Sequence, residues 1–134
     1  MRAALFALAF ACCGLPASAE TAEQKRKAIV EVFEASLREH AVFLNCSATD
    51  RDMHRIARKN WEEMIAATLL VMSERKADAA LVAEIGDRAA YDKMMRLDAT
   101  LRELLALCPE NWQKPLIELR FIFLHNRVGE ILGR

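Results

Sequence analysis

The sequence predicts an all-α protein: a disulfide-stapled, up-down four-helix bundle with a short extra helix near residues 79–85. Apolar residues recur every three or four positions along most of the chain, which is the spacing of one face of a helix. Four glycines and three prolines in 134 residues are too few for a fold of strands and turns. An even number of cysteines remains once an expected signal peptide is removed, which allows one disulfide.

Residues 1–19 have the composition of a secretory signal peptide. Arg2 is followed by an apolar run, and the run ends at small residues before Glu20, as a cleavage site does. We therefore expect a cleaved signal over 1–19 and a single helical domain over 20–134, located in the periplasm or secreted. Removing 19 of the 134 residues leaves 115, enough for one modest core.

Export would place the cysteines in an oxidising compartment, where pairs form disulfides. Cys12 and Cys13 belong to the expected signal, so Cys46 and Cys108 remain to form one bond. A lipid anchor on Cys12 or Cys13 is the alternative, although Phe10 stands near the position where a lipoprotein signal usually has leucine.

The charge balance excludes one class of partner. Lysine and arginine number 19 and aspartate and glutamate 19, and loss of Arg2 leaves a mature net charge of about −1. Nucleic-acid binding needs a net basic field, so we expect no nucleic-acid partner. No later apolar run approaches the roughly 18 residues that span a bilayer, so the mature chain is not expected to be transmembrane.

Two long helices are expected first. The first runs from Thr21 to about Leu44. The second begins at Ser47 or Thr49, either of which can cap it, with Asp50 and Asp52 offering carboxylates to its free N–H groups, and it ends near Glu74. Their core stripes are Ile29, Phe33, Leu37, Ala41 and Leu44 on the first helix and Met53, Ala57, Trp61, Met64, Thr68 and Val71 on the second.

The third region contains two apolar rows that one straight helix cannot bury together. Leu81 and Ile85 form the first row, after Asp78 as a cap. The second row lies on roughly the opposite side of a continued helix at about 100° per residue. We therefore expect a short helix over 79–85, a break at Gly86-Asp87, a long helix over about 88–108, and a last helix from 111–114 to Leu132.

The disulfide and the topology support each other. In an up-down-up-down bundle the first and third connections lie at the same end. Cys46 lies in the first connection and Cys108 at the start of the third, so the predicted bond would join that end of the bundle.

Polar side chains on the expected core faces are candidates for a buried site. Asn60, Asp98 and His125 fall at similar depth from the disulfide end and are expected to form a hydrogen-bonded layer that sets helix register. His40 lies in the middle of the apolar face of the first helix. A second interpretation makes all four the lining of a pocket between helices.

Motifs for metal, haem or catalysis are absent from the sequence. It has no Cys-x-x-Cys-His for haem attachment and no Glu-x-x-His for a di-iron bundle. His40 and His54 could approach each other, but two histidines make a weak metal site. We expect no metal, no cofactor, no catalytic residue and no enzymatic activity.

Basic residues cluster at the start of the second helix. Arg51, His54, Arg55 and Arg58 share one stripe, which opposes the helix dipole. Either this stripe is a solvated face paired with nearby carboxylates, or it faces an anionic partner.

The last helix carries an apolar row beyond its core stripe. Leu116, Leu119 and Phe123 point away from the stripe that includes Leu124 and Val128. A bundle helix buries one broad face, so this second row needs a cover. The cover is either the 79–85 helix or a docked second copy or other protein.

These observations together predict a small exported helical binding protein, of the accessory-subunit, inhibitor or immunity-factor, or assembly-chaperone type. Its partner is expected to be another protein or a second copy of itself. The alternative is a periplasmic carrier of a small molecule or cofactor, with the polar residues above lining its pocket.

Overall fold

The computed structural model describes residues 20–95, 106, 108 and 124–134, and within these ranges it contains five α-helices, one 3-10 helix and no strand. The all-α class is therefore confirmed for this part of the chain. Most of the expected third and fourth long helices lies outside it, as do the predicted signal peptide over 1–19 and the residues Asp98, Leu116, Leu119 and Phe123.

Helix α1 (Ala22–Cys46) begins with a capping box. Thr21 Oγ1 accepts a hydrogen bond from the Gln24 N–H at 3.2 Å, and Gln24 Oε1 accepts one from the Thr21 N–H at 2.8 Å. Reciprocal bonds of this kind satisfy N–H groups that have no partner at the start of a helix. The helix continues two residues beyond Leu44, where the sequence predicted its end.

Helix α2 (Arg51–Glu74) follows a 3-10 helix, η1 (Ser47–Thr49), and is capped by Asp50, whose carboxylate accepts an N–H of the first turn at 3.0 Å. The cap predicted at Ser47 or Thr49 is wrong. The Ser47 hydroxyl instead donates to a carbonyl in the last turn of α1. A carboxylate serves better here because it also opposes the positive end of the helix dipole.

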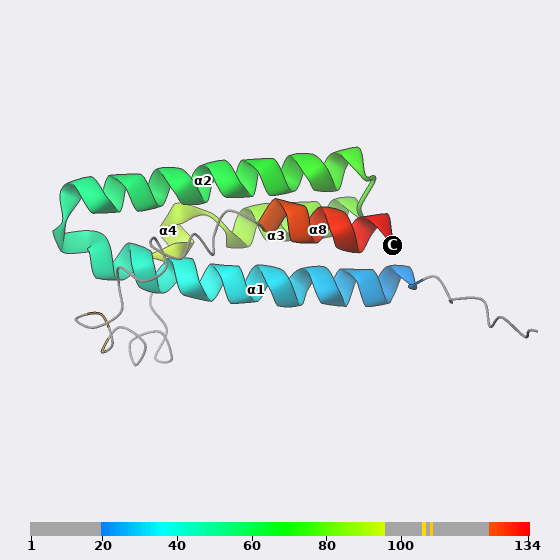
Figure 1. The fold of residues 1–134 in the computed structure, drawn as a ribbon, viewed down its shortest axis with the longest axis horizontal. Helices are drawn as coiled ribbons and strands as arrows, with labels where there is room; N and C mark the ends of the chain where they lie inside the picture. Colours follow the sequence, from blue (N-terminus) through cyan, green and yellow to red (C-terminus); the bar gives the residue numbers. More distant parts are fainter. Residues whose placement is uncertain (1–19, 96–105, 107, 109–123) are drawn as a thin grey trace, which may run out of the picture.

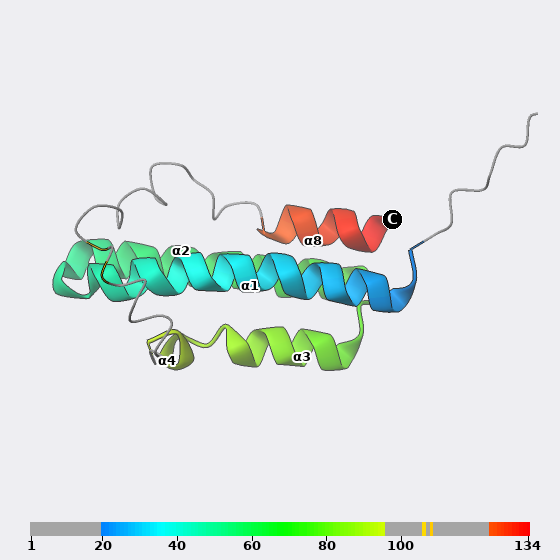
Figure 2. The ribbon, with the colours of Figure 1, turned by 90° about the horizontal axis from the view of Figure 1, so that it is seen from below.

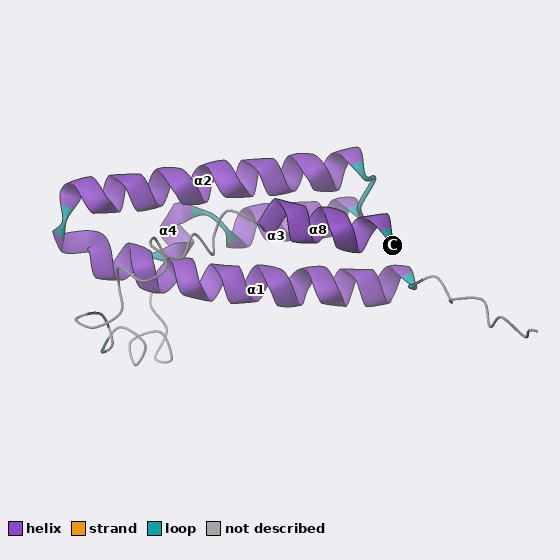
Figure 3. Cartoon of the chain, in the orientation of Figure 1, coloured by secondary structure: helices purple, strands orange, loops and turns teal. Residues whose placement is uncertain are grey.

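The described helices form three layers. Figure 2 shows α1 and α2 side by side in the middle, with α8 (Leu124–Gly133) on one side and α3 (Ala79–Arg88) and α4 (Tyr91–Met94) on the other. Among the described helices, α1 and α3 run one way and α2 and α8 the other, so α2 and α8 end at the same edge (Figure 1). Figure 3 shows that the loops from α1 through α4 are short.

The end of α2 is a Schellman turn that the sequence did not suggest. The Ala77 N–H donates to the Met72 carbonyl at 2.9 Å, and the Lys76 N–H to the Ser73 carbonyl at 3.1 Å. These are the two bonds of that motif, and its left-handed position usually holds glycine. Here it holds Lys76, with a φ of 55°.

Helix α3 begins as predicted, because both carboxylate oxygens of Asp78 accept N–H groups of its first turn at 3.3 Å. The predicted break at Gly86-Asp87 is wrong, since α3 continues to Arg88 and the chain bends at Ala90. Gly86 is helical and faces α2: a Cβ there would lie in ordinary van der Waals contact, 3.5 Å from Leu69 Cδ1. The break between the two apolar rows therefore lies at Ala90, four residues later than predicted.

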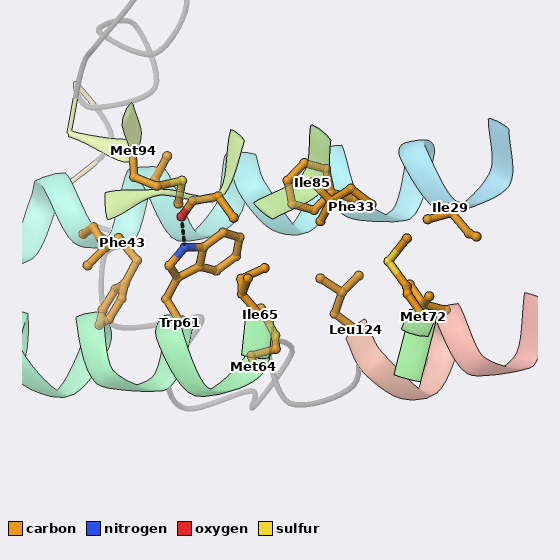
Figure 4. Close-up of a cluster of buried hydrophobic side chains, with 14 of the residues drawn as sticks. Ile29, Phe33, Phe43, Trp61, Met64, Ile65, Met72, Ile85, Met94 and Leu124 are labelled. Carbon is orange, nitrogen blue, oxygen red and sulfur yellow. Dashed lines mark hydrogen bonds between the residues drawn. The ribbon is translucent and has the colours of Figure 1, made fainter. Parts of the chain in front are cut away.

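Trp61 is 1% exposed and belongs to the core, which gathers side chains of α1, α2, α3, α4 and α8 (Figure 4). Its indole N–H donates to the Ala89 carbonyl at 2.8 Å. Ala89 is the C-cap of α3, directly after Arg88, where carbonyls have no partner within the helix. The Trp61 side chain of α2 thus both fills the core and hydrogen-bonds the carbonyl that follows the last turn of α3.

Charged pairs join α3 to the outer side of α1. Arg26 binds Asp78 at 2.9 Å and Glu84 at 2.8 Å, and Arg88 binds Glu34 at 2.9 Å. All are at least one third exposed, so each contributes a fraction of a kcal/mol. Their main effect is to favour one orientation of α3 on α1.

At the opposite end, α1 is held to α4. Asn45 Nδ2 donates to the Ala41 carbonyl at 2.8 Å and to the Met94 carbonyl at 3.0 Å. Next to it, the sulfur atoms of Cys46 and Cys108 are joined in the structure, with the two Cα atoms 5.4 Å apart.

Candidate functional site

His40 is a core residue in this structure. It is 1% exposed, its Nδ1–H donates to the Ser36 carbonyl at 2.9 Å, and its ring lies 4.5 Å from the Trp61 ring. Burial lowers the pKa of His40 from 6.5 to about 4, and the bond to Ser36 opposes this only in part. The ring is therefore neutral at pH 7 and packs as an aromatic side chain.

The polar layer predicted for Asn60, Asp98 and His125 is not formed as expected. Asn60 is exposed, and His125 is half-buried on α8. The reason is helical phase: Ala57, Trp61 and Met64 face the core, and Asn60 is turned about 100° away from Trp61. Asp98 lies outside the described residues.

The basic stripe of α2 divides into two parts. Arg51, Arg55 and Arg58 are exposed, but His54 is turned inward. His54 Nε2 accepts from the Tyr91 hydroxyl at 2.7 Å, and its Nδ1–H donates to the Leu44 carbonyl at 2.9 Å. The prediction that His54 faces an anion is therefore wrong, because both of its nitrogens are used to hold α4 against the end of α1.

Arg58 is the most precisely held of the three arginines. Its Nε donates to Glu62 at 2.7 Å, and its guanidinium lies 4.0 Å from the centre of the Tyr91 ring. The hydrogen bond to Glu62 raises the pKa of Arg58, and the side chain stays charged. Within the part of the chain that the structure describes, Arg55 makes one ion pair, with Asp52 at 3.7 Å.

Two surface grooves flank α2. The first, the α2–α8 groove, opens where these helices end together and has a volume of about 830 Å³. Six of its nine lining residues are polar or charged, and both charge signs are present. The lining residues are Val71, Glu74, Arg75, His125, Asn126, Gly129, Glu130, Gly133 and Arg134.

Glycines form part of the floor of the α2–α8 groove. A Cβ at Gly129 would lie 3.3 Å from Val71 Cγ1, so this glycine lets the two helices approach closely. A Cβ at Gly133 would have its nearest neighbour 3.8 Å away, at an Arg75 guanidinium nitrogen, so there the backbone is open. The His125 Nδ1 atom beside them is buried and makes no hydrogen bond within the described part of the chain.

The second groove, the α2–α3 groove, lies on the other side of the α1–α2 layer and is mainly apolar. It has a volume of about 340 Å³ and runs between α2 and the junction of α3 with α4. The lining residues are Trp61, Glu62, Ile65, Ala66, Leu69, Gly86, Ala89, Ala90 and Tyr91. The sequence showed neither groove, because each depends on which helices become neighbours.

No known protein family, curated protein or solved structure matches this chain. Over the described ranges, no helix is both long and apolar enough to cross a membrane. The same residues contain no group of three or more metal-ligating side chains.

Proposed function

We propose that this chain is a small exported helical binding protein that contacts another protein, or a second copy of itself, mainly through its last helix. The observation that carries the proposal is the α2–α8 groove. It is open to solvent, it displays charges of both signs, and its floor exposes backbone at Gly133. An open polar trough suits an extended polar segment of a partner better than a small apolar molecule.

The charges of the groove favour a specific partner over general adhesion. Arg75 and Glu74 come from α2, and Glu130 and Arg134 come from α8, so each helix contributes one cation and one carboxylate to the groove. Arg134 is only loosely paired, with Glu20 at 3.6 Å. Complementary charges at an interface contribute more to orientation and partner choice than to affinity.

A photo-crosslinking amino acid tests the proposal in the exporting cell. Placed at Asn126, inside the groove, it should give one discrete adduct after irradiation. The matched control is Ala83, an exposed residue of α3 on the opposite side of the molecule. Arg75→Glu should abolish the adduct from Asn126. Equal adducts from both positions, or none from Asn126, would rule out the groove as the contact.

The second apolar row of the last helix remains part of the proposal. If Leu116, Leu119 and Phe123 form a docking patch, Phe123→Glu should leave the monomer folded and abolish partner capture. If the row is buried within the monomer instead, the same change should lower the melting temperature strongly. Sedimentation and a thermal melt separate the two.

We also propose that the complete mature chain is a four-helix bundle beginning at Glu20 and stapled by Cys46–Cys108 in an oxidising compartment. The joined sulfurs and the alternating helix directions support this. The intact mass of protein recovered after export should equal that of residues 20–134 less two hydrogens. Two free thiols under denaturing, non-reducing conditions would contradict it.

A further inference from the structure

The α2–α3 groove combines an apolar channel with a row of cations at one end. Small residues on the α3 side, Gly86, Ala89 and Ala90, keep the channel open over Ile65 and Leu69. From Trp61 to Leu69 the α2 wall extends eight residues, which is about 12 Å. The channel is therefore long enough for an extended alkyl chain.

The arginines of the basic stripe continue this wall toward the disulfide end. At about 100° per residue, Arg51, Arg55 and Arg58 fall within roughly 60° of one another around α2. Glu62 and Leu69 of the groove fall on this same side of the helix. Arg55 precedes Glu62 by seven residues, or about 10 Å along the helix. The cations thus lie beyond one end of the channel rather than along it.

The carboxylates nearby leave these arginines able to bind a ligand. Glu62 is the one acid on this side of α2, and Arg58 binds it through Nε alone. The two Nη groups of Arg58 make no ion pair among the described residues. Asp50 caps the start of α2, and Asp52, 87% exposed, makes its one ion pair among the described residues with Arg55, at 3.7 Å. A guanidinium with free Nη groups can bind a carboxylate through two hydrogen bonds.

We propose that the α2–α3 groove binds a long-chain carboxylate, with its alkyl chain between α2 and α3 and its carboxylate at Arg55 and Arg58. The apolar channel selects the tail, because burying methylene groups there removes them from water. The ordered cation at the Tyr91 end selects the charged head. This site lies across the α1–α2 layer from the α2–α8 groove, so it is independent of the protein contact proposed above (Figure 2).

Calorimetric titration of the full mature protein with dodecanoate, below its micelle concentration, tests this site. Saturable binding of one dodecanoate per chain is expected. Dodecyl maltoside has the same chain with a neutral head, and acetate has the head without the chain. Each should bind at least about tenfold more weakly than dodecanoate. Equal affinity for dodecyl maltoside, or no saturable binding of dodecanoate, would overturn the proposal.

Variants locate the site. Arg55→Glu combined with Arg58→Glu should weaken dodecanoate binding at least about tenfold. Arg127→Glu, an exposed arginine of α8 across the molecule, is the matched control and should bind like the natural chain. Gly86→Leu should block the channel. If that variant unfolds, Ala66→Glu, at an exposed position of the wall, adds a repelling charge instead.

The source of the ligand is settled by a vesicle experiment. Vesicles containing phosphatidylglycerol should compete weakly with monomeric dodecanoate, because the channel takes a single chain. Binding to those vesicles without binding to dodecanoate would identify a membrane-surface site and overturn the proposal. Unchanged affinity in both the charge-reversal and the channel variants would do the same.

Discussion

Lowering the pH from 7 to 5 should destabilise this protein in part through His40. Its ring is buried between the Ser36 carbonyl and Trp61, and burial lowers its pKa from 6.5 to about 4. The unfolded chain takes up a proton near pH 6.5, whereas the folded chain does so only near pH 4. Over that window the unfolded state binds more protons, so the free energy of unfolding falls as the pH falls.

The size of the effect follows from the shift. Each unit of pKa difference corresponds to about 1.4 kcal/mol, so the whole shift corresponds to roughly 3 kcal/mol. Most of the decrease in the free energy of unfolding occurs below pH 6.5, and at pH 5 this free energy should be about 2 kcal/mol lower than at pH 7. A domain of this size has a total stability of about 5–15 kcal/mol, so the change is easily measured.

Urea unfolding of the natural chain and of His40→Phe, each at pH 7 and pH 5, isolates this contribution. Phenylalanine keeps an aromatic ring against Trp61 but cannot be protonated. The natural chain should lose about 2 kcal/mol more than the variant between the two pH values, whatever the stability of the variant at pH 7. The other ionisable groups are shared, so their contribution cancels in this comparison.

Two results would refute the reasoning. One is an NMR titration in which the His40 ring protonates near pH 6.5 in the folded protein. The other is an equal loss of stability in the natural chain and in His40→Phe, which would place the cause in other groups.

Three further predictions concern stability. Lys76→Gly should raise the free energy of unfolding by about 1 kcal/mol, because φ at this position is 55° and glycine adopts it without strain; a lower melting temperature would contradict this. Gly129→Val should cost about 1–3 kcal/mol, since even a Cβ would lie 3.3 Å from Val71; an unchanged urea midpoint would show that the helices can separate freely. Cys46→Ser should lower stability by up to about 4 kcal/mol, given the separation of 62 residues from Cys108, with helix content by circular dichroism unchanged at low temperature.

The sequence predicted those features of a helix that depend on that helix alone, namely its core face and, for α3, its N-terminal cap. The core faces of α1 and α2 follow from apolar spacing, and Asp78 was identified as the cap of α3. Where two signals competed, sequence reasoning failed. Asp50 caps α2 in place of Ser47 or Thr49, and the chain bends at Ala90 rather than at Gly86.

Candidate site residues were less predictable, because burial and pairing depend on neighbours. Asn60 is exposed although the sequence placed it in a polar layer. His54 was assigned to an anion-facing stripe, yet Tyr91 and the end of α1 turn it inward. The arginines were recognised as one stripe, but the apolar channel that continues it needs α3 as a second wall.

The sequence by itself determined the all-α class and the inward faces of α1 and α2, because helical periodicity and N-terminal capping act over a few residues. Only the tertiary structure decided which helices are neighbours. It placed α8 and α3 on opposite sides of α2, and so created two grooves of different chemistry beside one helix. The physical reason is that a side chain's surroundings are set by packing between elements distant in the chain, as with Trp61, whose indole N–H is satisfied 28 residues away at Ala89.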